Sequence, residues 1–122
     1  MRIKTKELTW RQQILEALPT LATQLIFDSK VQGGCSRRRP DALIDLLSHS
    51  IVLECDEFGH TGYSCENKRT MEIFEDLGSR PLVVLRFNPD KAQYASRFRA
   101  FLDQLEVSMV EVPEREVTEL TF

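Results

Sequence analysis

The sequence has few of the features that define several classes of protein. No apolar run approaches the roughly 18 residues needed to cross a bilayer, and the N-terminus leads into a mixed helical pattern instead of an apolar signal core. The three cysteines are an odd number without a CxxC pair, which excludes a disulfide framework and suits a reducing compartment. Five glycines and five prolines exclude a collagen-like or low-complexity chain. We therefore expect an intracellular protein with no membrane partner.

What is present is an ordinary globular composition, with 122 residues, 42% of them hydrophobic and 29% charged. This length predicts a single domain over residues 1–122. The net charge of −3 is unevenly spread, at +5 over residues 1–39, −3 over 40–102 and −5 over 103–122. A basic front followed by an acidic middle predicts a phosphate-binding surface beside a cation site, and the alternative is a solvated charged face. The candidate phosphate-binding residues are Arg37, Arg38 and Arg39.

Hydrophobic periodicity predicts an α/β fold, with a mixed sheet flanked by helices. The expected helices span residues 5–18, 65–77 and 92–105. The expected strands span residues 25–27, 42–47, 51–56 and 82–87, with further edge strands at 107–112 and 117–122. Segments 42–47 and 51–56 are expected to form a β-hairpin with its turn near His49, and Gly78 is expected to cap the second helix.

The strand at 51–56 carries two acids in an otherwise apolar segment. Because alternate side chains of a strand point to opposite faces, Glu54 and Asp56 share one face and Cys55 lies on the other. A buried carboxylate is costly unless something compensates it, and a bound cation is the simplest compensation. Asp41 converges on the same place if the hairpin sets the two strand ends side by side. Three oxygen donors with positions left for water and phosphate favour Mg²⁺ or Mn²⁺.

Other interpretations of these residues remain open. The acids would be purely structural if they formed ion pairs with neighbours such as Arg69 or Arg86. His60 lies in a glycine-flanked loop, where a neutral imidazole acts as a general base or binds metal, although a lone loop histidine is often merely exposed. Arg69 follows in the next helix and is able to hold a phosphate or a carboxylate bidentately.

The combined pattern resembles the PD-(D/E)XK, or restriction-endonuclease-like, nuclease superfamily. Within it, the chain is similar to the very-short-patch-repair-like and DUF559-like endonucleases, and the resemblance covers roughly residues 25–105. It implies a mixed sheet of about four strands flanked by helices in αβββαβα order. It also implies metal-dependent hydrolysis of DNA phosphodiester bonds, by nicking or double-strand cleavage, in a role such as DNA repair. The matching segments are Arg39-Pro40-Asp41, the run 52–60, Arg69 and the run 83–90.

The resemblance implies roles residue by residue. Asp41 matches the aspartate of the family's PD, and Glu54 matches its second metal ligand. Asp56 stands where the family has lysine, so it would bind metal or accept a proton, while His60 would take the role of base. A Mg²⁺ or Mn²⁺ held by these acids and by the backbone carbonyl of Cys55 would lower the pKa of a bound water. The phosphate contacts would come from Arg69 or Arg39.

Three alternatives differ in class from a nuclease. The first is a catalytically inactive nuclease-fold module that binds DNA through its basic loop. The second is a structural zinc site, which we do not expect because CxxC pairs are absent and Cys55 should point away from His60; its ligands would be Cys35, Cys55, His60 and Cys65. The third is an interaction domain that uses the acidic stretch 106–119. So small a nuclease has little surface for base readout, so a homodimer or a guiding protein would supply specificity.

Overall fold

The structure is a computed structural model that describes residues 5–27, 41–55 and 63–122, and for residues 63–69 it describes the backbone alone. Its elements, in chain order, are α1 (Thr5–Ala17), the 3-10 helix η1 (Pro19–Thr23), β1 (Leu25–Phe27), β2 (Ala42–Asp45), β3 (Ser50–Cys55), α2 (Tyr63–Asp76), β4 (Leu82–Phe87), α3 (Tyr94–Val110) and β5 (Val117–Thr121). Among the described residues, no helix is long and apolar enough to cross a membrane.

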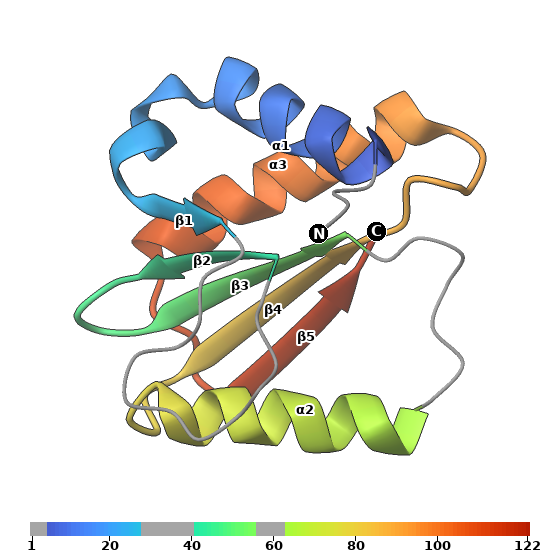
Figure 1. Ribbon diagram of the computed structural model, residues 1–122. Helices are drawn as coiled ribbons and strands as arrows, with labels where there is room; N and C mark the ends of the chain where they lie inside the picture. The colour runs from blue at the N-terminus through green and yellow to red at the C-terminus, as the bar shows by residue number, and fades with distance from the viewer. Residues whose placement is uncertain (1–4, 28–40, 56–62) are drawn as a thin grey trace.

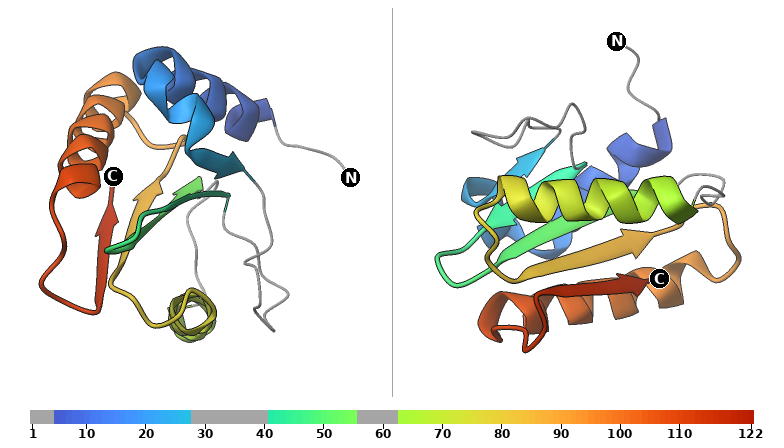
Figure 2. Two further views of the ribbon diagram at one scale, coloured as in Figure 1. Left: turned by 90° about the vertical axis from the view of Figure 1, so that its left-hand side faces the viewer. Right: turned by 90° about the horizontal axis from the view of Figure 1, so that it is seen from below.

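The five strands form one mixed sheet in the order β1-β2-β3-β4-β5. Strands β1, β2 and β3 pair antiparallel, whereas β3, β4 and β5 run parallel. Helices α1 and α3 cover one face of the sheet and α2 covers the other (Figures 1 and 2). The expected α/β class, with a mixed sheet between helices, is confirmed.

Each face of the sheet has its own hydrophobic core. Under α1 and α3, the fully buried side chains include Trp10, Phe87 and Phe101. The ring centroid of Phe101 lies 5.9 Å from that of Trp10 and 5.7 Å from that of Phe87. Under α2, Ile73 and Phe74 pack on the opposite side chains of β3 and β4. Burying a large apolar side chain contributes about 1.5–3 kcal/mol. The sheet is therefore held from both sides, which explains the unbroken apolar run in β4.

The expected edge strand at 107–112 is wrong. Residues 107–110 are the last turn of α3, and the chain from Glu111 to Glu116 links that helix to β5. The valines in this segment favour a strand locally, but Leu105 and Met109 lie four residues apart and both pack on the core under α3. Tertiary packing at helical spacing therefore decides the conformation. The other expected edge strand, at the C-terminus, is confirmed as β5.

The turns that set the register of the sheet lie where the sequence predicts them. The β2–β3 hairpin closes through the Leu46 N–H, which donates to the His49 carbonyl at 2.9 Å. Gly78 follows the end of helix α2 and terminates it with a φ of +83°, a conformation that glycine adopts at little cost. The Ser79 N–H then donates to the Phe74 carbonyl at 3.1 Å, as in a Schellman cap.

Candidate functional site

The β2–β3 hairpin brings Asp41 and Glu54 together. Its register pairs Ala42 with Leu53, so the residue before β2 lies opposite Glu54 near the end of β3. The backbone N–H of Cys55 donates a 2.8 Å hydrogen bond to Oδ2 of Asp41, which fixes that carboxyl group against the end of β3. The expected convergence of these two carboxyl groups is therefore present.

Both acids are at least partly withdrawn from water. Glu54 is only 3% exposed, and Asp41 is half-buried. Burial, followed by the negative charge of Glu54, raises the pKa of Asp41 from its ordinary 3.8 to about 7. A hydrogen bond shared with Glu54 acts in the same direction, while the Cys55 N–H opposes the change. The raised pKa shows that two negative charges are unfavourable at this place, where a bound cation would compensate both.

Helix α1 adds Glu7 to this pair, a residue that the sequence pattern did not single out. A hydrogen bond from the Glu7 side chain lowers the pKa of Asp41, against the other influences. Nη2 of Arg11, one turn along the helix, donates a 2.6 Å hydrogen bond to Oε2 of Glu7 and forms an ion pair with it. No local motif connects a glutamate in the first turn of α1 with Asp41, 34 residues later, because only the docking of α1 on the sheet brings the two side chains together.

Arg86 lies beside Glu54 on the neighbouring strand. The parallel register of β3 and β4 pairs these two residues, and Arg86 is 6% exposed. Its Nε donates to the Glu119 carboxylate on β5, and its Nη2 lies 3.5 Å from the Thr70 hydroxyl on α2. This buried positive charge partly compensates the acids nearby, and it is the strongest argument for a purely structural acid pair.

The Cys55 side chain lies on the other face of the sheet, as the alternation of β3 predicts. It packs against the core under α1 and α3, near Tyr94. Burial, followed by the neighbouring Cys55, raises the pKa of Tyr94. The thiol therefore does not share a face with Glu54, and only the backbone of Cys55 touches the acid pair.

The remaining predicted site residues lie wholly or partly outside what the structure describes. Asp56, His60 and the basic run Arg37, Arg38 and Arg39 lie outside the described residues, as does Cys35 of the zinc alternative. Arg69 and Cys65 belong to α2 at positions where the backbone alone is described.

The described residues supply a pair of carboxylates for a cation, not a complete cage. Within 5–27, 41–55 and 63–122, no group of three or more His, Cys, Asp or Glu side chains is arranged to hold a metal ion. Mg²⁺ is commonly bound through one or two carboxylates plus water and substrate phosphate, so the oxygen donors of Asp41 and Glu54 fit that ion. They do not fit a structural zinc site, in which four protein ligands, mostly sulfur and nitrogen atoms, fill the coordination sphere.

Comparisons with known proteins leave the site to be interpreted from its own geometry. No protein-family model matches the chain, and neither the curated proteins nor the solved structures give a significant match.

Proposed function

We propose that the protein is a metal-dependent endonuclease that hydrolyses DNA phosphodiester bonds, with a restriction-endonuclease-like core. The observation that carries the proposal is the pair formed by the half-buried Asp41 and the buried Glu54 at the open end of the β2–β3 hairpin, where the pKa of Asp41 is raised. The order of helices and strands, α, β, β, β, α, β, α, then β, agrees with the resemblance to the PD-(D/E)XK superfamily.

The chain's own residues have separate tasks in this proposal. Asp41 and Glu54 would hold Mg²⁺ or Mn²⁺, and Asp41 would release its proton on binding the ion. When bound, the ion would supply Lewis-acid activation of a water and compensate charge on the phosphate. Asp56 would add a further oxygen ligand, and His60 would accept a proton from the attacking water. The Cys55 N–H keeps the Asp41 carboxyl oriented toward the pair.

The DNA contacts in this proposal come from the basic residues. Arg37, Arg38 and Arg39 bind backbone phosphates, and Arg69 holds the phosphate next to the scissile bond. Such contacts make affinity fall as salt rises, and they carry little sequence information. Specificity then comes from DNA shape, from a homodimer or from a guiding protein.

Supercoiled plasmid tests the proposal directly. The purified protein is incubated with Mg²⁺, with Mn²⁺ and with EDTA, beside the variants Glu54→Gln and Asp41→Asn. We expect nicked or linear DNA with either metal and none with EDTA, and a loss of at least about 100-fold in rate in both variants, because each removes a charge that holds the ion.

The matched control is Asp45→Asn, which removes an acid from the same hairpin. Asp45 lies at the other end of β2 and pairs with Arg80 at 2.8 Å, so its loss should leave cleavage unchanged. Full activity in Glu54→Gln or Asp41→Asn would refute the site. Equal loss in all three variants would point to damage to the hairpin instead.

A second candidate is a DNA-binding module without catalysis. Arg86 favours it, because an internal cation beside Glu54 reduces the need for a metal. Binding of a short duplex in EDTA, with no cleavage of plasmid, mismatched or single-stranded DNA in any metal, would support this candidate over the nuclease.

A further inference from the structure

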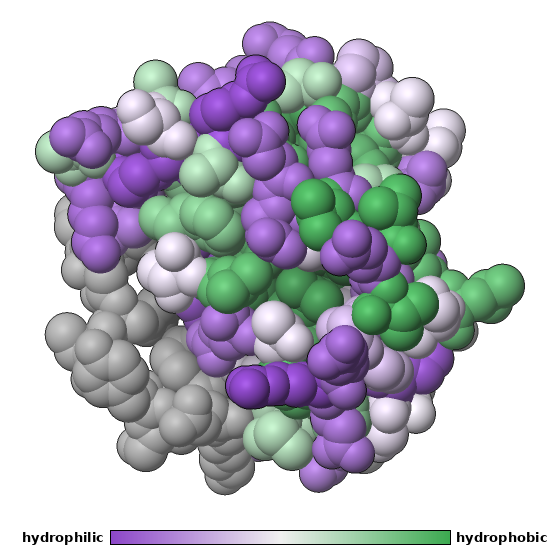
Figure 3. Space-filling model, turned by 180° about the vertical axis from the view of Figure 1, so that it is seen from behind, coloured by the Kyte–Doolittle hydropathy of each residue, from purple (hydrophilic) through white to green (hydrophobic). Residues whose placement is uncertain are grey.

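Apolar side chains are exposed at the end of the molecule opposite Asp41 and Glu54. Leu47 in the hairpin turn is 97% exposed, and Val110 at the end of α3 is 81% exposed. The two segments are joined, since His49 Nε2 donates to the Ser108 carbonyl at 2.6 Å. Seen from behind, the half of the molecule that carries this turn shows several hydrophobic groups between hydrophilic ones (Figure 3). Solvent-exposed valines and a leucine gathered at one place commonly mark an interaction surface.

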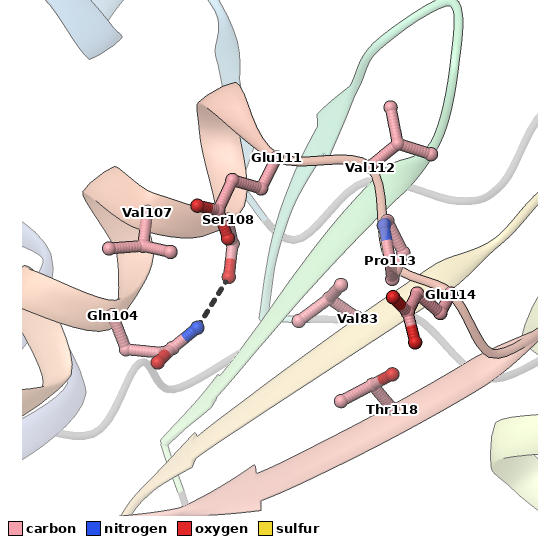
Figure 4. A pocket seen from close by; sticks show the side chains of 9 residues that line it. All are labelled: Val83, Gln104, Val107, Ser108, Glu111, Val112, Pro113, Glu114 and Thr118. Atoms are coloured by element: carbon pink, nitrogen blue, oxygen red, sulfur yellow. Dashed lines mark hydrogen bonds between the residues drawn. The ribbon is translucent and has the colours of Figure 1, made fainter.

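A pocket of about 280 Å³ lies beside these side chains, between the end of α3 and strands β4 and β5 (Figure 4). Its apolar walls come from Val83 of β4, from Val107 of α3 and from Val112 and Pro113 of the following segment. This volume lies at the lower end of the range for small-molecule sites, which begin at about 300 Å³. It has room for one large side chain of a peptide, which would contact both the valines and the polar lining residues Gln104, Ser108 and Thr118.

The rim of the pocket is negatively charged. Glu111 and Glu114 line it, and both are exposed. The last turn of α3 has no basic residue, so these acids lie at the negative end of the helix dipole, where negative charge is unfavourable. Residues 103–122 carry a net charge of −5. The acidic rim repels DNA and also repels the same surface on a second copy of this chain, whereas a cationic ligand is attracted.

We propose that this surface binds a cationic segment of a partner protein, which inserts one apolar side chain into the pocket. We call it the α3 patch and define it by Leu47, Val107, Val110, Val112 and the pocket rim at Glu111 and Glu114. Glu54 lies four residues along β3 from the start of that strand, or about 13 Å at the usual rise. A partner on the α3 patch therefore does not cover the acid pair.

A model peptide provides a defined probe for this surface. The ¹⁵N-labelled full chain is titrated with a 14-residue peptide of Leu and Lys, and separately with one in which every Leu is replaced by Ser. We expect amide shifts confined to residues 46–48, 83 and 104–118 with the Leu/Lys peptide, and at least tenfold weaker binding of the Ser/Lys peptide. Equal affinity of the two peptides, or shifts centred on Asp41 and Glu54, would overturn the proposal because charge alone would then explain binding.

Variants separate the α3 patch from other exposed apolar positions. The double variant Val110→Ser, Val112→Ser should weaken binding of the Leu/Lys peptide at least tenfold. The control Met71→Ser should leave it unchanged, since Met71 is an exposed apolar residue of α2 on the opposite face. Unaltered binding in the double variant would refute the proposal. The proposal would also be refuted if the free protein formed a concentration-dependent dimer that the double variant did not form. The α3 patch would then bind a second copy of this chain. All these measurements are independent of DNA cleavage.

Discussion

At the residue scale, Asp41 combines partial burial with a neighbouring carboxyl group, and both raise its pKa. Alternation along a strand and the closure of a hairpin were enough to predict that it meets Glu54, because both rules are local. The same rules correctly placed the Cys55 side chain on the opposite face. These local rules could not predict the contact of Glu7 with Asp41, because it forms only when α1 packs against the sheet. A side chain brought in by long-range docking leaves no signal in the spacing of its neighbours.

The raised pKa of Asp41 predicts how stability depends on pH without metal. The folded state holds the Asp41 proton up to about pH 7, whereas the unfolded chain releases it near pH 3.8. Stability from this group is therefore present at low pH and is lost as pH rises toward 7, by about 3 kcal/mol between pH 5 and pH 8. Asp41→Asn keeps an oxygen for the Cys55 N–H but does not titrate. In EDTA, urea unfolding of the variant should lack this loss, so its advantage over the wild type should grow from pH 5 to pH 8. An equal pH slope in both proteins would contradict the assignment.

Glu7 should influence the pKa of Asp41 and, through it, the affinity for a metal ion. Its hydrogen bond lowers the pKa of Asp41, so Glu7→Ala should raise that pKa further and make the proton harder to displace. We expect Mn²⁺ binding at pH 7, followed by the electron paramagnetic resonance signal of free Mn²⁺, to weaken about threefold to tenfold, which is about 0.7–1.4 kcal/mol. Raising the pH to 8.5 should recover most of the loss. Glu16→Ala, at an exposed position of the same helix, should bind Mn²⁺ like the wild type.

At the element scale, the sequence predicted most helices and strands but not the end of α3. The β-branched valines of residues 107–112 match a strand pattern locally, and only the buried position of Leu105 and the packing of Met109 show that the helix continues. Strand β4 lies between β3 and β5 and pairs with both in parallel. Its one charged residue, Arg86, joins three elements by pairing with Glu119 on β5 and reaching Thr70 on α2.

This arrangement predicts an asymmetry between the two partners of the Arg86–Glu119 ion pair. Arg86→Met removes the cation that pairs with Glu119 and lies beside Glu54 in the sheet, and loss of one partner of a buried pair costs about 3–5 kcal/mol. The Glu119 side chain is 37% exposed, so Glu119→Gln should cost less than about 1 kcal/mol. Urea unfolding at pH 8 measures both changes. Equal costs would show that Glu119 alone balances Arg86 and that Glu54 does not depend on this cation.

At the scale of the whole molecule, the acid pair and the α3 patch lie at opposite ends of the same sheet. The acid pair depends on the carboxyl end of β3, and the α3 patch depends on the hairpin turn and the end of α3. His49 connects the turn to α3, since it is 1% exposed and both of its ring nitrogens have partners, the Ser108 carbonyl and the Ser48 hydroxyl at 2.9 Å. Loosening the contact between the hairpin turn and α3 is therefore not expected to change the positions of Asp41 and Glu54 at the other end of the sheet.

His49→Ala tests this separation. Removing a buried ring creates a cavity and leaves the Ser108 carbonyl without its hydrogen bond, so we expect a loss of about 2–4 kcal/mol in the free energy of unfolding. Because the hydrogen bond between Asp41 and Cys55 lies at the far end of β3, Mn²⁺ affinity and plasmid cleavage should remain within twofold of the wild type at temperatures where the variant is folded. Binding of the Leu/Lys peptide should weaken, since the turn that carries Leu47 loses its attachment to α3. A variant that loses metal affinity and peptide binding together would show instead that the hairpin acts as one rigid unit, and that a partner on the α3 patch is able to influence the acid pair.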